Sequence, residues 1–274
     1  MSFDLQNYLA NSRAIDVSDI DWDSASEFPV PAEHRRCLTF MMDVESHTIV
    51  YLRDLLNSRA IVDPDISAFL ACWVYEETFH GRAIERFLTS IGEPVAANRV
   101  ETIRTSSNWR ATVDLVGTFA VSRLSRHFPA AYLTWGAINE LTAHAGYRLL
   151  SDRTENPILA KLLRRIMRDE SRHFAFYYHE AGKRLDEPGA QRLTKFLLTR
   201  FWGPVGSNVK SDDDVAFLTA YLFGGQRGAA SIEHIEQTIR RLPGLDWFDL
   251  LGQARDSAVE RCGGAWDGVA AVEA

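Results

Sequence analysis

Apolar residues recur at three- and four-residue steps along four long stretches of this chain, the spacing that places them on one face of an α-helix. Asp63-Pro64 and Asn156-Pro157 precede two of these stretches, and a capping side chain followed by proline is a typical helix start. No alternating run of β-branched residues stands out between turns. The pattern predicts an all-α fold with long helices over about residues 31–56, 64–92, 128–147 and 157–186.

The spacing of these helices indicates how they connect. Short turns join the first to the second and the third to the fourth, whereas residues 93–125 form a long connection in which we expect a helix over 109–124. This is the arrangement of a ferritin-like four-helix bundle with a long crossover between helices two and three. We expect one domain over residues 1–274, with its core bundle at about 31–187.

The remaining segments predict less regular structure. Residues 190–262 indicate three or four shorter helices packed outside the bundle, broken at Gly203-Pro204, Gly224-Gly225 and Pro243-Gly244. The first 30 residues are polar without sustained periodicity, so we expect them to lie over the surface. The last dozen residues are rich in glycine and alanine and are expected to be loosely ordered.

Composition narrows the class of protein. A hydrophobic content of 46% and a charged content of 24% are those of an ordinary globular protein. A net charge of −7 and the lack of a basic tract argue against nucleic-acid binding. The 3 cysteines are far apart, which excludes a thiolate zinc site and fits a reducing compartment. No secretory signal is visible, and no apolar run approaches the roughly 18 residues of a membrane span. We therefore expect a cytoplasmic protein.

Two short phrases carry the candidate chemistry: EETFH at residues 76–80 and DESRH at residues 169–173. Each contains Glu-x-x-His, which places a carboxylate and an imidazole on one helix face. A single glutamate lies one helix-turn-helix length before each phrase. Together these predict a doubled set of metal ligands, namely Glu45, Glu77, His80, Glu140, Glu170 and His173.

The four glutamates of this set each interrupt an apolar stripe. A carboxylate removed from water is unfavourable unless it is paired, protonated or bound to a metal. Four carboxylates balance two divalent ions, and oxygen and imidazole ligands without thiolate suit iron or manganese. The alternative is that the acids lie on solvated helix faces and the stripes are assigned one residue off.

Glu76 and Asp169 directly precede a ligand glutamate. One residue is about 100° of helix rotation, so neither shares the ligand face fully. We expect each to accept the outer N–H of a ligand histidine and thereby to fix its orientation. An exposed acid without such a role is the alternative.

Other residues near the predicted ligands are weaker candidates. His144 lies one turn after Glu140 and is an alternative ligand, although a packed histidine is expected there; His47 and His179 lie off the ligand stripes. Four inward-facing aromatic residues are expected to be core, with electron transfer as the alternative: Trp73, Trp135, Tyr147 and Tyr177. A basic strip is either a solvated face or a docking surface for an acidic carrier: Arg164, Arg165, Arg168 and Arg172.

At these residues the chain resembles the soluble acyl-(acyl-carrier-protein) desaturases of the ferritin-like superfamily. Their motif of a single glutamate, Glu-Glu-x-x-His, a single glutamate and Asp-Glu-x-x-His matches this chain at Glu45, 76–80, Glu140 and 169–173, within about residues 35–185. The resemblance implies a homodimer with two Fe²⁺ ions, manganese being an alternative in one or both positions. It implies reduction of O2 and desaturation of a fatty acyl chain, with acyl-carrier protein and a ferredoxin-type electron donor as partners.

Two positions bear on the choice of function, one counting against a plant-type desaturase and the other against the N-oxygenases. Plant-type desaturases have a threonine one turn after the third-helix glutamate, where this chain has Ala143. Di-iron N-oxygenases and hydroxylases of small molecules share the Asp-Glu-x-x-His phrase, but the N-oxygenases have a further histidine where this chain has Ile166. A non-catalytic, iron-binding ferritin-like protein is the alternative from another class.

Overall fold

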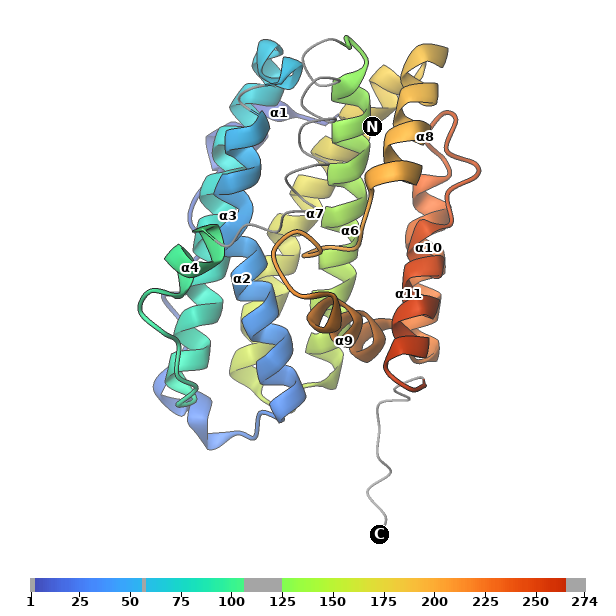
Figure 1. Ribbon diagram of the computed structural model, residues 1–274. Coiled ribbons are helices and arrows are strands. Elements are labelled where there is room, and N and C mark those ends of the chain that lie inside the picture. The colour runs from blue at the N-terminus through green and yellow to red at the C-terminus, as the bar shows by residue number, and fades with distance from the viewer. Residues whose placement is uncertain (1–2, 56–57, 106–124, 265–274) are drawn as a thin grey trace.

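The structure, a computed structural model, describes residues 3–55, 58–105 and 125–264. Within these ranges every regular element is helical, which confirms the predicted all-α fold. Four long helices lie side by side (Figure 1) and bury the main hydrophobic core between them. They are α2 (Ala32–Leu55), α3 (Pro64–Ser90), α6 (Phe128–Arg153) and α7 (Pro157–Leu185).

Side-chain caps begin two of the long helices at the predicted positions. Asp63 Oδ1 accepts hydrogen bonds from the backbone N–H groups of Asp65 and Ile66 at the start of α3. Asn156 Oδ1 accepts from the N–H groups of Ile158 and Leu159 at 3.1 Å at the start of α7. Each cap satisfies helix donors that lack an intrahelical partner.

Two glycines allow the helices to approach closely. A Cβ atom at Gly81 would lie 2.9 Å from Ser46 Oγ and 3.3 Å from Glu45 Cβ, so α2 and α3 pack tightly beside His80. A Cβ atom at Gly136 would lie 2.4 Å from the Tyr177 ring, which packs directly on the backbone of α6. Both contacts lie beside the predicted ligands and hold the four helices close together there.

Four shorter helices follow the long ones, as predicted for residues 190–262. They are α8 (Pro188–Phe201), α9 (Asp212–Phe223), α10 (Gln226–Ile239) and α11 (Leu250–Arg261). The helices α8, α9 and α10 all contact α6, and α11 contacts α9 and α10. These four shorter helices lie on the α6 side of the long helices (Figure 1).

The first 30 residues are less superficial than expected. They contain the helix α1 (Leu5–Asn11) and the 3₁₀ turn η1 (Asp23–Glu27), and the side chains of Tyr8, Trp22 and Ala25 are buried. The expectation of a surface segment is wrong at these positions. Isolated apolar anchors separated by polar residues leave no periodic signal, so the pattern did not predict their burial.

The connections hold two further elements, the 3₁₀ turn η2 (Arg59–Val62) and the helix α4 (Arg99–Thr105). Arg99 pairs with the buried Asp43 of α2 through two hydrogen bonds of 2.6 and 2.7 Å, which fixes α4 against the bundle. The helix expected over 109–124 lies outside the described residues, as do the last ten residues. No described helix is both long and apolar enough to cross a membrane.

Candidate metal centre

The structure brings all six predicted ligands together in the middle of the long helices. They come from α2 (Glu45), α3 (Glu77, His80), α6 (Glu140) and α7 (Glu170, His173). All six side chains are buried, and the two histidines are fully inaccessible to solvent. The alternative of solvated helix faces is therefore wrong for this set.

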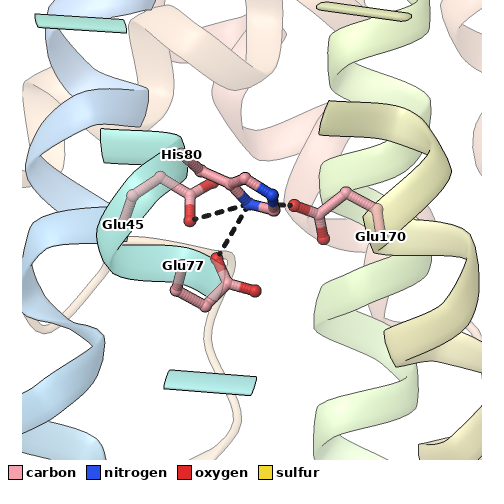
Figure 2. Close-up of side chains that lie close together, drawn as sticks. All are labelled: Glu45, Glu77, His80 and Glu170. Carbon is pink, nitrogen blue, oxygen red and sulfur yellow. Dashed lines mark ion pairs between the residues drawn. The ribbon is translucent and has the colours of Figure 1, made fainter. Parts of the chain in front are cut away.

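The six residues form two overlapping groups, each of which can hold a metal ion. One contains Glu45, Glu77, His80 and Glu170, and the other contains Glu77, Glu140, Glu170 and His173. Within each group, one ligand atom per residue lies within 4.8 Å of all the others. Figure 2 shows the first group, with three carboxylates pointing toward one edge of the His80 ring.

Two of the glutamates belong to both groups and divide their oxygens between them. Glu77 Oε2 lies 3.5 Å from His80 Nδ1, while its Oε1 lies 3.0 Å from His173 Nδ1. Glu170 Oε1 lies 3.4 Å from His80 Nδ1, while its Oε2 lies 3.9 Å from His173 Nδ1. Each of these carboxylates can therefore bridge two ions.

The other two glutamates each serve one group. Glu45 Oε2 lies 3.9 Å from His80 Nδ1, and Glu140 Oε2 lies 3.5 Å from His173 Nδ1. The arrangement has an approximate internal symmetry, in which each half offers one histidine and one terminal carboxylate. Together the six side chains offer four carboxylates and two imidazoles, and each of the two groups can hold a metal ion.

The outer nitrogen of each ligand histidine meets a carboxylate. His80 Nε2 lies 3.1 Å from Asp169 Oδ2, and His173 Nε2 lies 2.8 Å from Glu76 Oε2. An acceptor at Nε2 places the proton there, which leaves Nδ1 with a lone pair for a metal. Both Nδ1 atoms are buried without a hydrogen-bond partner, as this role requires.

Further side chains hold the ligand carboxylates and were not predicted in these roles. Trp73 Nε1 donates to Glu140 Oε1 at 3.0 Å, and the Tyr147 hydroxyl donates to Glu45. Trp73 lies four residues before Glu77, and Tyr147 lies seven after Glu140, so helical spacing alone places both on ligand faces. Their hydrogen-bonding roles follow only from the packing of separate helices.

The N-terminal segment completes the surroundings of Glu76. This carboxylate accepts from the Tyr8 hydroxyl and from Ser12 Oγ, each at 2.9 Å, and from the backbone N–H of Arg13 at 3.3 Å. Arg172 donates to Glu76 at 3.1 Å and to Asp169 at 2.6 Å, so one guanidinium joins the two outer carboxylates. No sequence signal connects Tyr8 with this site.

The cluster places four carboxylates beside only two imidazoles, so the charges of the protein groups alone do not balance. Burial raises the pKa values of Glu45 and Glu140, and repulsion from the neighbouring carboxylates raises them further. Burial acts to lower the pKa values of the two histidines, but the negative carboxylates around each ring, including Asp169 and Glu76 at the outer nitrogens, raise both well above the usual range. Divalent cations would relieve this repulsion and compete with protons for the same atoms.

The weaker candidates lie outside both groups. His144 is half-buried, and burial lowers its pKa; His47 is buried with its ring 5.3 Å from that of Tyr51. Of the basic strip, Arg165 pairs with Asp19 of the N-terminal segment, and Arg172 holds the outer carboxylates. The strip is therefore only partly a solvated face.

A cavity of about 340 Å³ lies beside the ligand cluster. Its lining includes Glu45, Glu77, Glu140 and Glu170, so the space reaches the predicted metal ligands directly. The walls come from α2, α3, α6, α7, α8 and the segment 203–208. They are mainly apolar and aromatic, including Leu55, Trp73, Phe128, Trp135 and Phe201.

Gly206 lies in the wall of this cavity. Its φ of +89° lies in the left-handed region, which favours glycine. A Cβ atom there would lie 2.4 Å from the Phe40 ring of α2. Glycine thus lets the segment 203–208 lie close against α2, where it lines the cavity.

No protein-family model matches this chain, and no curated protein matches its sequence.

Proposed function

We propose that this protein is an O2-dependent oxidoreductase with two ferrous ions held by Glu45, Glu77, His80, Glu140, Glu170 and His173. The two overlapping ligand groups are the observation that supports this proposal. Glu77 and Glu170 each direct one carboxylate oxygen toward the His80 group and the other toward the His173 group. The donor set of carboxylate and imidazole suits iron, with manganese an alternative in one or both positions. Two ferrous ions supply electrons and coordination positions for the reduction of O2.

The protein's own contribution is orientation and exclusion of water. Asp169 and Glu76 hold the proton of each histidine at Nε2 and keep Nδ1 directed at the metal positions. Trp73 and Tyr147 fix the two terminal carboxylates. The apolar walls of the cavity keep a bound substrate dry beside the ligands, which protects a reactive centre from side reactions.

The substrate proposed first is a fatty acyl chain carried on acyl-carrier protein, as the resemblance to the desaturases implies. The apolar cavity supports it, since an alkyl chain offers no polar group to its walls. In the balanced reaction two hydrogens leave the chain. These, with two electrons from a ferredoxin-type donor and two protons, reduce O2 to two water molecules. A cytoplasmic homodimer belongs to the same proposal.

A second candidate is hydroxylation or N-oxygenation of a small molecule. The observation in its favour is a polar residue, Asn139, in the cavity wall next to the ligand Glu140. Non-catalytic iron binding is the candidate from another class. It gives no role to a cavity that reaches the metal ligands.

The reaction with O2 separates these candidates. The iron-loaded protein is reduced, exposed to O2 with acyl-carrier-protein substrates, and the acyl chains are analysed for a new double bond. A double bond formed with stoichiometric O2 uptake supports desaturation. Iron binding without any substrate-dependent O2 uptake, in this assay and in a parallel screen of amines and hydroxylation substrates, contradicts the oxidoreductase.

A further inference from the structure

A single nitrogen atom connects the two outer carboxylates. Arg172 Nη2 donates to Glu76 Oε1 at 3.1 Å and to Asp169 Oδ1 at 2.6 Å. The second oxygen of Glu76, Oε2, lies 2.8 Å from His173 Nε2. The second oxygen of Asp169, Oδ2, lies 3.1 Å from His80 Nε2. A continuous series of hydrogen bonds therefore runs from one ligand histidine to the other through one guanidinium group.

The two outer carboxylates are nevertheless held unequally. Glu76 accepts hydrogen bonds from three further donors of the N-terminal segment, namely the Tyr8 hydroxyl, Ser12 Oγ and the backbone N–H of Arg13. The Asp169 side chain contacts only Arg172 and His80 among the residues that the structure describes. Glu76 can therefore keep its position without Arg172, whereas Asp169 depends on it.

Burial and charge increase this difference. The Glu76 side chain is not exposed at all, but 15% of the Asp169 side chain is, so Asp169 has a path toward water. The two carboxylates share one cationic donor, and without it their negative charges would repel each other at short range. The carboxylate that can turn outward in response is Asp169. His80 would then lose the acceptor that orients its ring.

We propose that Arg172 is a positioning residue for the His80 group: it fixes Asp169, and Asp169 in turn keeps the His80 ring directed at the metal position. The N-terminal segment gives the His173 group a separate support through Glu76. The inference rests on the proposed function, since it concerns the binding of the two ions. The two ligand groups have similar donors but differ in what holds them, so loss of the guanidinium should weaken one binding step selectively.

Stepwise binding of Fe²⁺ to the metal-free protein, measured under nitrogen by isothermal titration calorimetry, tests this selectivity. Arg172→Met removes the donor and keeps an unbranched side chain. We expect one of the two binding steps to weaken about 10- to 100-fold, the effect of losing an outer partner of a ligand histidine. The other step should stay close to its wild-type value.

Arg168→Met is the matched control. Arg168 lies one turn before Arg172 on α7, is exposed, and has no hydrogen bond or ion pair with any residue that the structure describes. Its replacement removes the same charge from the same helix, so a general effect of surface charge on the binding of Fe²⁺ would appear in both variants. We expect both binding steps of Arg168→Met to match the wild type.

Arg172→Lys tests whether the donor itself is responsible. One nitrogen of Arg172 contacts both carboxylates, so a single ammonium group can take its place, unlike at a site where a guanidinium binds through two nitrogens. The lysine variant should recover most of the weakened step. Arg172→Gln is measured in parallel, with melting followed by circular dichroism, so that the result does not depend on one variant.

Two unchanged steps in both Arg172→Met and Arg172→Gln overturn the inference, as does an equal loss in both steps, which would indicate a general disturbance of the fold. A lysine variant as weak as Arg172→Met, or an equal loss in Arg168→Met, also overturns it. A wild type that binds no Fe²⁺ contradicts the proposed function itself. A wild type that binds two ions, with variants that lack the selective loss, contradicts only the role of Arg172.

Discussion

The hydroxyl of Tyr8 donates a hydrogen bond to Glu76 Oε2 at 2.9 Å, and the same oxygen lies 2.8 Å from His173 Nε2. Tyr8 belongs to the short helix α1, 68 residues away from Glu76 in the sequence. Through a single carboxylate, the N-terminal segment is therefore connected to a predicted metal ligand. Glu76, His173 and Tyr8 are all buried, so water does not replace this contact.

Tyr8→Phe should weaken metal binding. The change removes one hydrogen bond to Glu76 and leaves the ring in place, so we expect a loss of affinity of about three- to tenfold, corresponding to about 1 kcal/mol. Competitive titration with a metal-binding dye measures the affinity. Tyr75→Phe is the control, because Tyr75 lies on α3 with 48% of its surface exposed. Equal affinities in both variants would contradict the connection.

Removal of the negative charge of Asp169 or Glu76 should lower metal affinity more than Tyr8→Phe does. Asp169→Asn and Glu76→Gln keep the shape of each side chain but weaken the hold on the ligand histidine, and we expect each to lower metal affinity about 10- to 100-fold. The same titration measures it. Glu85→Gln on α3 is a matched control, since Glu85 belongs to neither ligand group. Wild-type affinity in both outer variants would contradict the assigned role.

Glu180 should make stability dependent on pH at a distance from the metal centre. Burial acts to raise its pKa, but hydrogen bonds from Lys183 and Arg184 lower the pKa below the usual value. A lowered pKa in the folded state gives stability that is present above the unfolded pKa of about 4.5 and lost as pH falls through the folded value. Glu180→Gln should therefore lower the free energy of unfolding by about 1 kcal/mol at pH 7.

Urea denaturation of the wild type and Glu180→Gln at several pH values measures this difference. The gap should begin to narrow as pH falls below about 4.5, the unfolded value, and should close once pH has fallen through the lowered folded pKa of the wild-type carboxylate. Glu187→Gln, with an exposed side chain, should show no comparable gap. A gap that stays constant over the whole range would contradict the assignment to the Glu180 charge.

Asn156→Ala should destabilise the fold by about 2–3 kcal/mol. The loss combines the cap of α7, worth about 1 kcal/mol, with a buried hydrogen bond from Asn156 Nδ2 to the backbone oxygen of Ala25. That bond holds the N-terminal segment against α7. Thermal or urea unfolding measures the change, and Asn11→Ala on the exposed end of α1 is the control. A loss below about 0.5 kcal/mol would contradict the double role of Asn156.

The helices were predictable because their signals are local. Asp63-Pro64 and Asn156-Pro157 mark starts that the structure confirms, and the stripes through Glu77 and Glu170 place these residues inside the fold. The recurrence of Glu-x-x-His was enough to select the residues that the structure brings together.

Contacts between distant segments were not predictable in the same way. Tyr8 is a single aromatic residue in a polar segment, and its bond to Glu76 depends on how α1 packs against α3. Arg172 was grouped with a basic strip, although it lies between Glu76 and Asp169. The cavity depends on the packing of several helices and on the segment 203–208.

The most direct test of the central claim is the iron content of wild type and Glu77→Ala after anaerobic loading with Fe²⁺ and removal of free metal. Glu77 belongs to both ligand groups, so its loss should affect both ions. We predict about two irons per chain in the wild type and in Glu85→Ala, and well below one in Glu77→Ala. A wild type without iron, or a Glu77→Ala variant that keeps both irons, would contradict the account.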